Sequence, residues 1–155
     1  KLDRESLPVR EKQKGDTLMA NGMYVHAIQV YQKLLETEDL EEYREGLTES
    51  IWHNLGCAYS YLFLMEKALE CFQKAYEAGK SQTALRTLLL AVHSVRSRAE
   101  YEAFARDLGV GEEILEEIES ILKNFDMKKK PFVEQGQADN LLENLTREYH
   151  RGTGS

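Results

Sequence analysis

Proline, the commonest helix breaker, is nearly missing from this chain. Only Pro8 and Pro131 occur among the 155 residues, and more than 120 residues separate them. Residues that favour helices, above all Leu, Glu, Ala and Lys, are plentiful instead. The sequence therefore predicts an all-α fold.

Long hydrophobic runs are missing as well. No stretch approaches the roughly 18 apolar residues that a membrane-spanning helix needs, and residues 1–5 lack the core of a signal peptide. The two cysteines, Cys57 and Cys71, both stand inside apolar helical patterns, where a thiol behaves as a small buried hydrophobe. We therefore expect no membrane contact from this segment and a reducing, cytoplasmic location. Because the chain begins at lysine, we also expect it to be part of a longer protein.

Basic residues are too few for a protein that mainly binds nucleic acid. The 20 Lys and Arg face 27 Asp and Glu, a formal net charge of −7, whereas phosphate binding is driven by excess positive charge. RNA binding stays an alternative only if the run from Lys128 to Lys130 joins other basic residues. The G-x-S-x-G, G-x-x-x-x-G-K-[ST] and G-x-G-x-x-G motifs of common enzymes are missing too. The sequence thus predicts a protein without catalytic activity or cofactor.

What the chain does contain is an internal repeat. Six positions recur 41 residues later, and within each copy their spacing traces one face of an α-helix. The helix before each copy matches as well, because Gly15 corresponds to Gly56. The first copy has Tyr24, Ala27, Ile28, Tyr31, Leu34 and Leu35, and the second has Met65, Ala68, Leu69, Phe72, Ala75 and Tyr76. The repeating unit is therefore helix, turn, helix.

The second copy resembles the tetratricopeptide repeat (TPR), whose pattern is W-x2-L-G-x2-Y followed by A-x3-F-x2-A. The matching residues are Trp52, Leu55, Gly56, Tyr59, Ala68, Phe72 and Ala75. The resemblance implies a right-handed stack of antiparallel helical hairpins, an alpha solenoid, that binds other proteins. Within it we expect the small residues Gly56 and Ala68 to face each other, so that the helices approach closely, and Trp52 and Phe72 to be buried.

These patterns divide one expected domain into five segments. Repeat one covers residues 8–36, a long-helix insertion 37–50, repeat two 51–80, a divergent repeat three 81–109, and C-terminal capping helices 111–150. The insertion accounts for the seven residues by which the spacing of 41 exceeds the TPR period of about 34.

Local signals predict where individual helices begin and end. Asp39 followed by Glu42 is a capping-box pattern that favours one long helix over residues 40–61, although Gly46 could instead break it. Ser97 with Glu100 predicts another helix start, and Gly109 its end. Towards the C-terminus we expect a helix that carries Ile114, Leu115, Ile118, Ile121, Leu122 and Phe125, then a basic loop over 126–131. A final helix over 133–150 would carry an apolar stripe of Ala138, Leu141, Leu142, Leu145 and Tyr149.

In TPR proteins the first helices of successive repeats line a concave groove, and the resemblance implies that a protein or peptide segment binds there. Its residues would be Lys12, Asp16 and Met19 from the first repeat, His53, Asn54, Cys57 and Tyr61 from the second, and Arg86, Thr87 and His93 from the third. We expect Asn54 to hydrogen-bond a peptide backbone and Tyr61 to supply apolar contact, while Lys12 and Arg86 set the charge preference.

Some TPR domains hold the C-terminal carboxylate of a chaperone with a clamp of Lys, Asn and Arg side chains. Lys12 and Asn54 fit this clamp, but Asp16 stands where the clamp needs asparagine and would repel a carboxylate. Thr83 and Thr87 stand where basic residues are needed. Binding of a chaperone tail is therefore an alternative to general peptide binding.

Two further alternatives concern metal binding and self-association. His53, Cys57 and His93 could form a zinc site, although we expect no metal because Cys57 directly follows the packing glycine. The apolar end of the stack could instead join copies of the chain into a homo-oligomer. The C-terminal helices would either cap this end or fill the groove.

Overall fold

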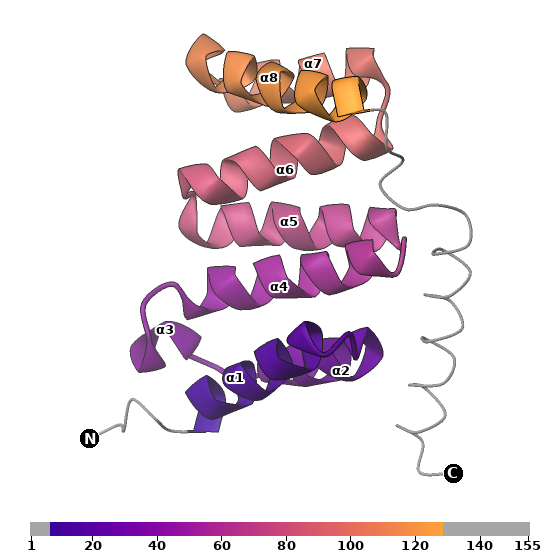
Figure 1. Ribbon diagram of the computed structural model, residues 1–155. Helices are drawn as coiled ribbons and strands as arrows, with labels where there is room; N and C mark the ends of the chain where they lie inside the picture. Colours follow the sequence, from indigo (N-terminus) through magenta and orange to yellow (C-terminus); the bar gives the residue numbers. More distant parts are fainter. Residues whose placement is uncertain (1–6, 129–155) are drawn as a thin grey trace.

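The computed structural model describes residues 7–128, which form eight α-helices and no strand (Figure 1). The near absence of proline correctly predicted this all-helical fold. The helices are α1 (Leu7–Ala20), α2 (Tyr24–Leu34), α3 (Leu40–Tyr43), α4 (Leu47–Tyr61), α5 (Met65–Gly79), α6 (Gln82–Val95), α7 (Arg98–Leu108) and α8 (Glu112–Lys128).

The helices lie in layers along one direction (Figure 1). Helix α1 packs on α2 and α4 on α5, while contacts between α2 and α4 and between α5 and α6 join successive layers. Helices α7 and α8 close the upper end against α6. One continuous core runs through these layers, and its least exposed large side chains are Tyr31, Leu47, Ile51, Leu88, Leu89 and Ile118. The chain is thus a helical-repeat solenoid.

Two glycines allow the helices of each hairpin to approach closely. A Cβ atom added at Gly56 would stand 2.6 Å from Cε1 of Phe72, and one added at Gly15 would stand 2.6 Å from Cε1 of Tyr31. The two pairs are 41 residues apart, so the contact repeats with the sequence. The three atoms nearest to the added Cβ of Gly56 all belong to the Phe72 ring, and the contact of Gly56 with Ala68 stays a prediction.

Trp52 is less buried than the sequence predicted. Phe72 is 6 % exposed and belongs to the core, whereas Trp52 is only partly buried against it. The indole ring borders a cleft beside α3, and the ammonium group of Lys74 lies 5.3 Å from the ring centroid. Trp52 therefore lies at the edge of the core, where the insertion leaves space beside it.

The long helix predicted over residues 40–61 is also wrong. The backbone takes a left-handed conformation at Asp39 (φ 57°) and at Gly46 (φ 80°), so α3 and α4 are separate. No side-chain capping bond forms at Asp39. Instead the Glu41 carboxylate accepts hydrogen bonds from the backbone N–H groups of Gly46 (2.8 Å) and Thr48 (2.9 Å) at the start of α4. Burial opposes ionisation of Glu41, but these N–H groups lower its pKa overall.

The helix signals of the third hairpin are confirmed. The Ser97 side chain accepts from the backbone of Glu100, and the Glu100 carboxylate accepts from the Ser97 backbone, which is a complete capping box. Gly109 ends α7 in the left-handed conformation (φ 70°). Because α8 continues to Lys128, the loop predicted from residue 126 begins too early. The rest of that loop and the helix predicted over 133–150 lie outside the described residues.

None of the helices in the described range 7–128 combines the length and the apolar character needed to cross a lipid bilayer.

Candidate protein-binding face

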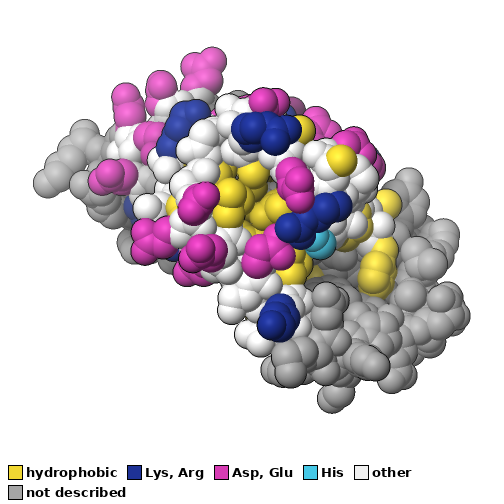
Figure 2. All heavy atoms as spheres, turned by 90° about the horizontal axis from the view of Figure 1, so that it is seen from above, with side chains coloured by type: hydrophobic (Ala, Val, Ile, Leu, Met, Phe, Trp, Pro, Cys, Tyr) yellow, Lys and Arg dark blue, Asp and Glu magenta, His cyan; other side chains and the backbone are white. Residues whose placement is uncertain are grey.

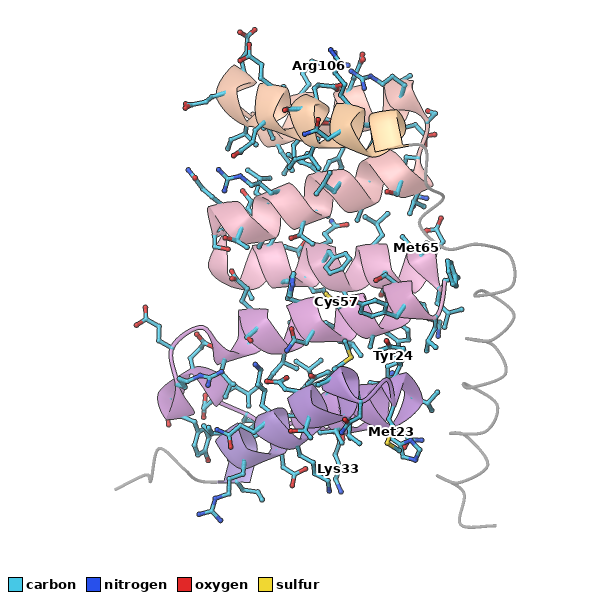
Figure 3. The ribbon with its side chains drawn as sticks, in the orientation of Figure 1. Met23, Tyr24, Lys33, Cys57, Met65 and Arg106 are labelled. Atoms are coloured by element: carbon cyan, nitrogen blue, oxygen red, sulfur yellow. The ribbon has the colours of Figure 1, made fainter. Side chains whose placement is uncertain are left out.

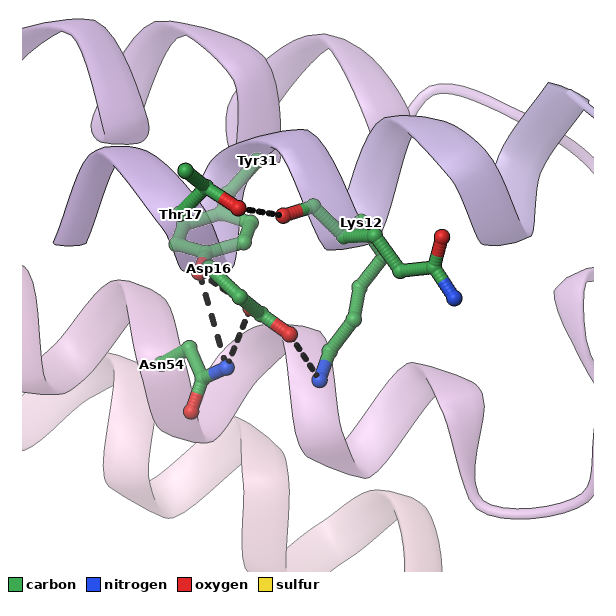
Figure 4. Close-up of polar contacts among 6 residues, drawn as sticks. Lys12, Asp16, Thr17, Tyr31 and Asn54 are labelled. Atoms are coloured by element: carbon green, nitrogen blue, oxygen red, sulfur yellow. Dashed lines mark hydrogen bonds and ion pairs between the residues drawn. The ribbon is translucent and has the colours of Figure 1, made fainter. Parts of the chain in front are cut away.

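The residues predicted to bind a partner lie on α1, α4 and α6. At the α1 end of this face, Asp16 joins three helices (Figure 4). Its carboxylate accepts hydrogen bonds from the Tyr31 hydroxyl (2.5 Å) and the Asn54 amide (2.8 Å), and it forms an ion pair with Lys12 (2.7 Å). Burial, and then the nearby Asp16 carboxylate, raise the pKa of Tyr31 far above its usual value, so the hydroxyl stays a donor. This cluster ties α1, α2 and α4 together and balances the charge of Asp16.

His53 and Cys57 form a second, half-buried pair one turn apart on α4. The Cys57 Sγ and His53 Nε2 atoms are 3.5 Å apart, and the His53 ring lies against Phe72 at a centroid distance of 5.7 Å. Burial lowers the pKa of His53 and raises the pKa of Cys57. Both groups are therefore neutral at pH 7, so neither adds charge to the face.

His93, the third residue of the zinc alternative, has a different neighbour. Its ring meets the Tyr101 ring edge-on at 5.1 Å, between α6 and α7. Within residues 7–128, no three His, Cys, Asp or Glu side chains are grouped in a way that would hold a metal ion. The structure does not bring His53, Cys57 and His93 together.

At the α6 end, the face contains a hollow of about 650 Å³ between α6 and the start of α8. Arg86 lies in this hollow and forms an ion pair with Glu117 of α8 (2.5 Å). The hydroxyl group of Thr87, the next residue, donates a hydrogen bond to the carbonyl oxygen of Thr83 (3.1 Å). The hollow is lined by Gln82, Arg86, Gly111, Glu113, Ile114, Glu116 and Glu117. Among its lining residues within the described range 7–128, Arg86 is the only cation beside three glutamates, so this part of the hollow is acidic overall.

Tyr61 lies at the edge of the face, where α4 ends. Its ring is 44 % exposed and stacks on the Tyr24 ring of α2, with centroids 4.9 Å apart and planes 11° from parallel. Met19, the last residue but one of α1, is partly buried against the core. Tyr61 thus offers a partner an open aromatic surface, and Met19 offers less.

A second cleft, of about 350 Å³, lies beside the insertion. The indole of Trp52 and the side chains of Leu35 and Leu40 make it partly apolar, while Asp39, Glu41 and Glu42 make it acidic. Sequence reasoning did not predict this cleft, because a continuous helix over 40–61 would have left no space for it.

The helix order and the contact between Gly56 and Phe72 identify α4 and α5 as one two-helix unit. A comparison with family models agrees, since the model of the tetratricopeptide repeat matches residues 49–78. Residues 49–78 are a tetratricopeptide repeat. The resemblance seen in the sequence is confirmed for this TPR hairpin. No curated protein and no solved structure matched the chain.

The candidate face contains functional groups that sequence reasoning missed. In the sequence Tyr31 is only one of the six repeated positions, yet its hydroxyl donates to Asp16. The sequence did contain a signal for this bond. The residue equivalent to Tyr31 in the second repeat is Phe72, which lacks the hydroxyl group, and a buried hydroxyl needs a hydrogen-bond acceptor. Glu117 was not among the residues predicted for the face, but it pairs with Arg86. Nothing local in the sequence indicates that pair, since the two residues are 31 positions apart.

Proposed function

We propose that this chain is a scaffold or adaptor module, without catalysis, that binds a segment of another protein on the face made by α1, α4 and α6. The observation that supports the proposal most is the tetratricopeptide repeat at residues 49–78, because such repeats generally act as protein-binding modules. The face combines hydrogen-bonding groups such as Asn54 and Thr87 with the exposed Tyr61 ring. Mixed surfaces of this kind suit peptide recognition.

The charges of the face favour a neutral or basic segment over an acidic one. Lys12 is paired with Asp16 and Arg86 with Glu117, so the two cations expected to set the preference are already balanced. Glu113 and Glu116 are exposed at the α6 end. An acidic segment would have to displace these internal pairs, and for this reason we rank the chaperone-tail alternative below general peptide binding.

The proposal is tested by selecting peptides from a displayed library and measuring their affinities by calorimetry. Replacement of Tyr61 or Thr87 by alanine should weaken binding of a selected peptide by roughly 1–2 kcal/mol while the fold is kept. Glu77→Ala on the exposed side of α5 is the matched control and should leave the affinity unchanged. Peptides that bind all three variants as tightly as the original chain would place the binding surface away from this face.

A second function, self-association, is favoured by the upper end of the stack. Seen from above, hydrophobic side chains of the α7–α8 end are visible in the middle of a ring of Lys, Arg, Asp and Glu (Figure 2). Leu108 is 39 % exposed there, and Phe104 and Leu115 are only partly buried. Light scattering over a range of concentrations tests this function, and a mass that stays at one chain would exclude it.

A further inference from the structure

The tight turns of the first two hairpins share a left-handed backbone position. Gly22 (φ 74°) occupies it between α1 and α2, and Phe63 (φ 61°) occupies it 41 residues later between α4 and α5. Glycine adopts this conformation freely, whereas a bulky residue there is a genuine outlier. Phe63 therefore stands where the turn itself favours glycine, and such strain often accompanies a functional role.

Phe63 belongs to an exposed aromatic surface at this edge of the stack. Its side chain is 39 % exposed, and those of Tyr61 and Leu64 are 44 % and 40 % exposed. Tyr24 extends this surface because its ring stacks on Tyr61. Met23, Tyr24 and Met65 lie along the same edge of the stack (Figure 3). We call Tyr24, Phe63 and Leu64 the turn patch, and Tyr61, which borders it, stays part of the candidate face.

The chain around the turn patch carries no charge. Residues 17–32 and residues 50–65 contain no Asp, Glu, Lys or Arg, although charged residues make up 30 % of the sequence. Exposed turns are normally polar, and a surface that is rich in aromatic residues and poor in charge is typical of the centre of an interface. The turn patch therefore suits an apolar partner that brings no charge of its own to the contact.

We propose that the turn patch is covered by the C-terminal part of the same chain, through Leu141, Leu142, Leu145 and Tyr149. In the helix predicted over 133–150 these residues would share one face, so the segment would have an apolar stripe to match the patch. Helix α8 ends on the edge of the stack at which the α4–α5 turn also lies (Figure 1).

The length of the chain permits this contact. Leu141 follows Lys128, the last residue of α8, by 13 positions. Five of these residues in extended conformation span about 17 Å, and eight in the helix predicted over 133–150 span about 12 Å more, roughly 29 Å together. The successive packing of α8 on α6, α6 on α5 and α5 on α4 gives three helix-to-helix steps of about 8–10 Å each. The stripe can therefore reach the turn patch without any rearrangement of the stack.

The charged surroundings of the α7–α8 end make it a poorer match for the same stripe. Arg98 pairs there with Glu102 (2.9 Å) and with Glu119 (2.6 Å). An apolar segment covering this end would have to approach these charges, and removing charges from water costs free energy. The turn patch itself contains no charged residue, and the nearest one along the chain, Glu66, is paired with Arg96 at its border.

The contact is tested in the full chain by disulfide trapping. Cys57 and Cys71 are replaced by alanine, and Leu64→Cys is combined with Leu145→Cys. Mild oxidation should give an intramolecular disulfide at a rate that does not depend on protein concentration. The comparison pair, Leu108→Cys with Leu145→Cys, samples the α7–α8 end and should react roughly tenfold more slowly, because its effective concentration is lower. Circular dichroism confirms that each variant is helical.

Three results would overturn the proposal. Faster disulfide formation in the Leu108→Cys and Leu145→Cys variant would place the stripe at the α7–α8 end. Disulfide-linked dimers would indicate that a second copy of the chain covers the patch. Equally slow disulfide formation in both variants would mean that the stripe docks at neither place. A single-cysteine Leu64→Cys variant gives an independent measurement. Its thiol should react with a maleimide roughly tenfold faster after Leu141→Asp and Leu145→Asp, whereas Asn140→Asp, on the opposite side of the stripe, should change nothing.

Discussion

The Phe72 ring occupies the space in which a side chain of residue 56 would stand. A Cβ atom on Gly56 would lie within 3.0 Å of three atoms of that ring, and Tyr31 blocks Gly15 in the same way. The glycines therefore set the distance between the two helices in the first two hairpins. Each aromatic ring then packs directly against the backbone of the facing helix.

Replacement of Gly56 by alanine should therefore destabilise the chain. Although alanine favours the helix itself, its methyl group must push the buried Phe72 ring aside, and we expect a net cost of about 1–3 kcal/mol. The measurement is the free energy of unfolding in urea. Gly111→Ala is the matched control, because no atom lies within 4 Å of its added Cβ, and its unfolding free energy should not decrease.

A double variant checks the cause of this loss. Adding Phe72→Leu to Gly56→Ala removes the ring that causes the clash. The double variant should therefore lose less unfolding free energy than the sum of the losses of the two single variants. Strict additivity would show that the clash with Phe72 is not the source of the instability.

The hydrogen bond between Tyr31 and Asp16 leads to a second prediction. Tyr31→Phe places a phenylalanine in the first hairpin, as Phe72 stands in the second, and it removes one of the hydrogen-bond donors to Asp16. We expect the free energy of unfolding to fall by about 1–2 kcal/mol at pH 7. In an Asp16→Leu background the same change should cost less, because no carboxylate remains to be satisfied. The measurement is urea unfolding of the original chain, Tyr31→Phe, Asp16→Leu and the double variant, which together form a double-mutant cycle. An equal cost of Tyr31→Phe with and without Asp16 would contradict the assigned bond.

The pH dependence of stability follows from His53. Burial lowers its pKa in the folded chain, so the unfolded chain binds a proton more tightly. Stability is therefore fully present above the ordinary histidine pKa of about 6.5 and falls as the pH drops below that value. Unfolding between pH 7.5 and 5.5 should show this decrease, and His53→Gln should flatten it. An unchanged pH dependence in that variant would assign the decrease to other groups.

The parts of the fold that were predicted correctly are those in which one local signal acts alone. The helical spacing of the apolar positions, the Ser97 capping box and Gly109 each have one structural interpretation, and each is confirmed. Around residues 39–46 two signals conflict, because the capping pattern of Asp39 favours a long helix and Gly46 favours a break. Glu41 stabilises the break by capping α4 through a contact with Thr48 that no helical spacing predicts.

The candidate face was predicted by helix position, but the pairing of its charges was not. Spacing along a helix shows which residues share a side, and Lys12 with Asp16 is a pair of this kind. Arg86 meets Glu117 only because α8 packs on α6, a contact that depends on the tertiary structure. The sequence therefore suggested free cations where the structure has balanced ion pairs.

The two left-handed turn positions should respond in opposite ways to substitution. Gly22→Ala adds a methyl group in open space but at a φ of 74°, so we expect a loss of about 1 kcal/mol from backbone strain alone. Phe63→Gly relieves that strain while removing an exposed ring, so the free energy of unfolding should change by less than about 1 kcal/mol. Urea unfolding of both variants is the measurement. A large loss in Phe63→Gly would mean that the ring is needed for folding.

The last prediction concerns the charge preference of the binding face. Asp16 stands where the carboxylate clamp of some TPR domains has asparagine, and here it accepts from Asn54 and pairs with Lys12. Asp16→Asn removes the negative charge and leaves Lys12 and Asn54 available to a ligand. A peptide that ends in a free carboxylate should therefore bind this variant about tenfold more tightly than it binds the original chain, which corresponds to about 1.4 kcal/mol.

Calorimetry with two forms of one peptide isolates this effect. The form with an amidated C-terminus has the same sequence and lacks the terminal charge, so its affinity should change little between the two proteins. Adding Thr87→Arg to Asp16→Asn supplies a second cation on α6 and should increase the preference for the free carboxylate further, most strongly at low salt. Equal gains for both peptide forms would instead mean that Asp16 hinders binding by its shape or by its hydrogen bonds, not by its charge.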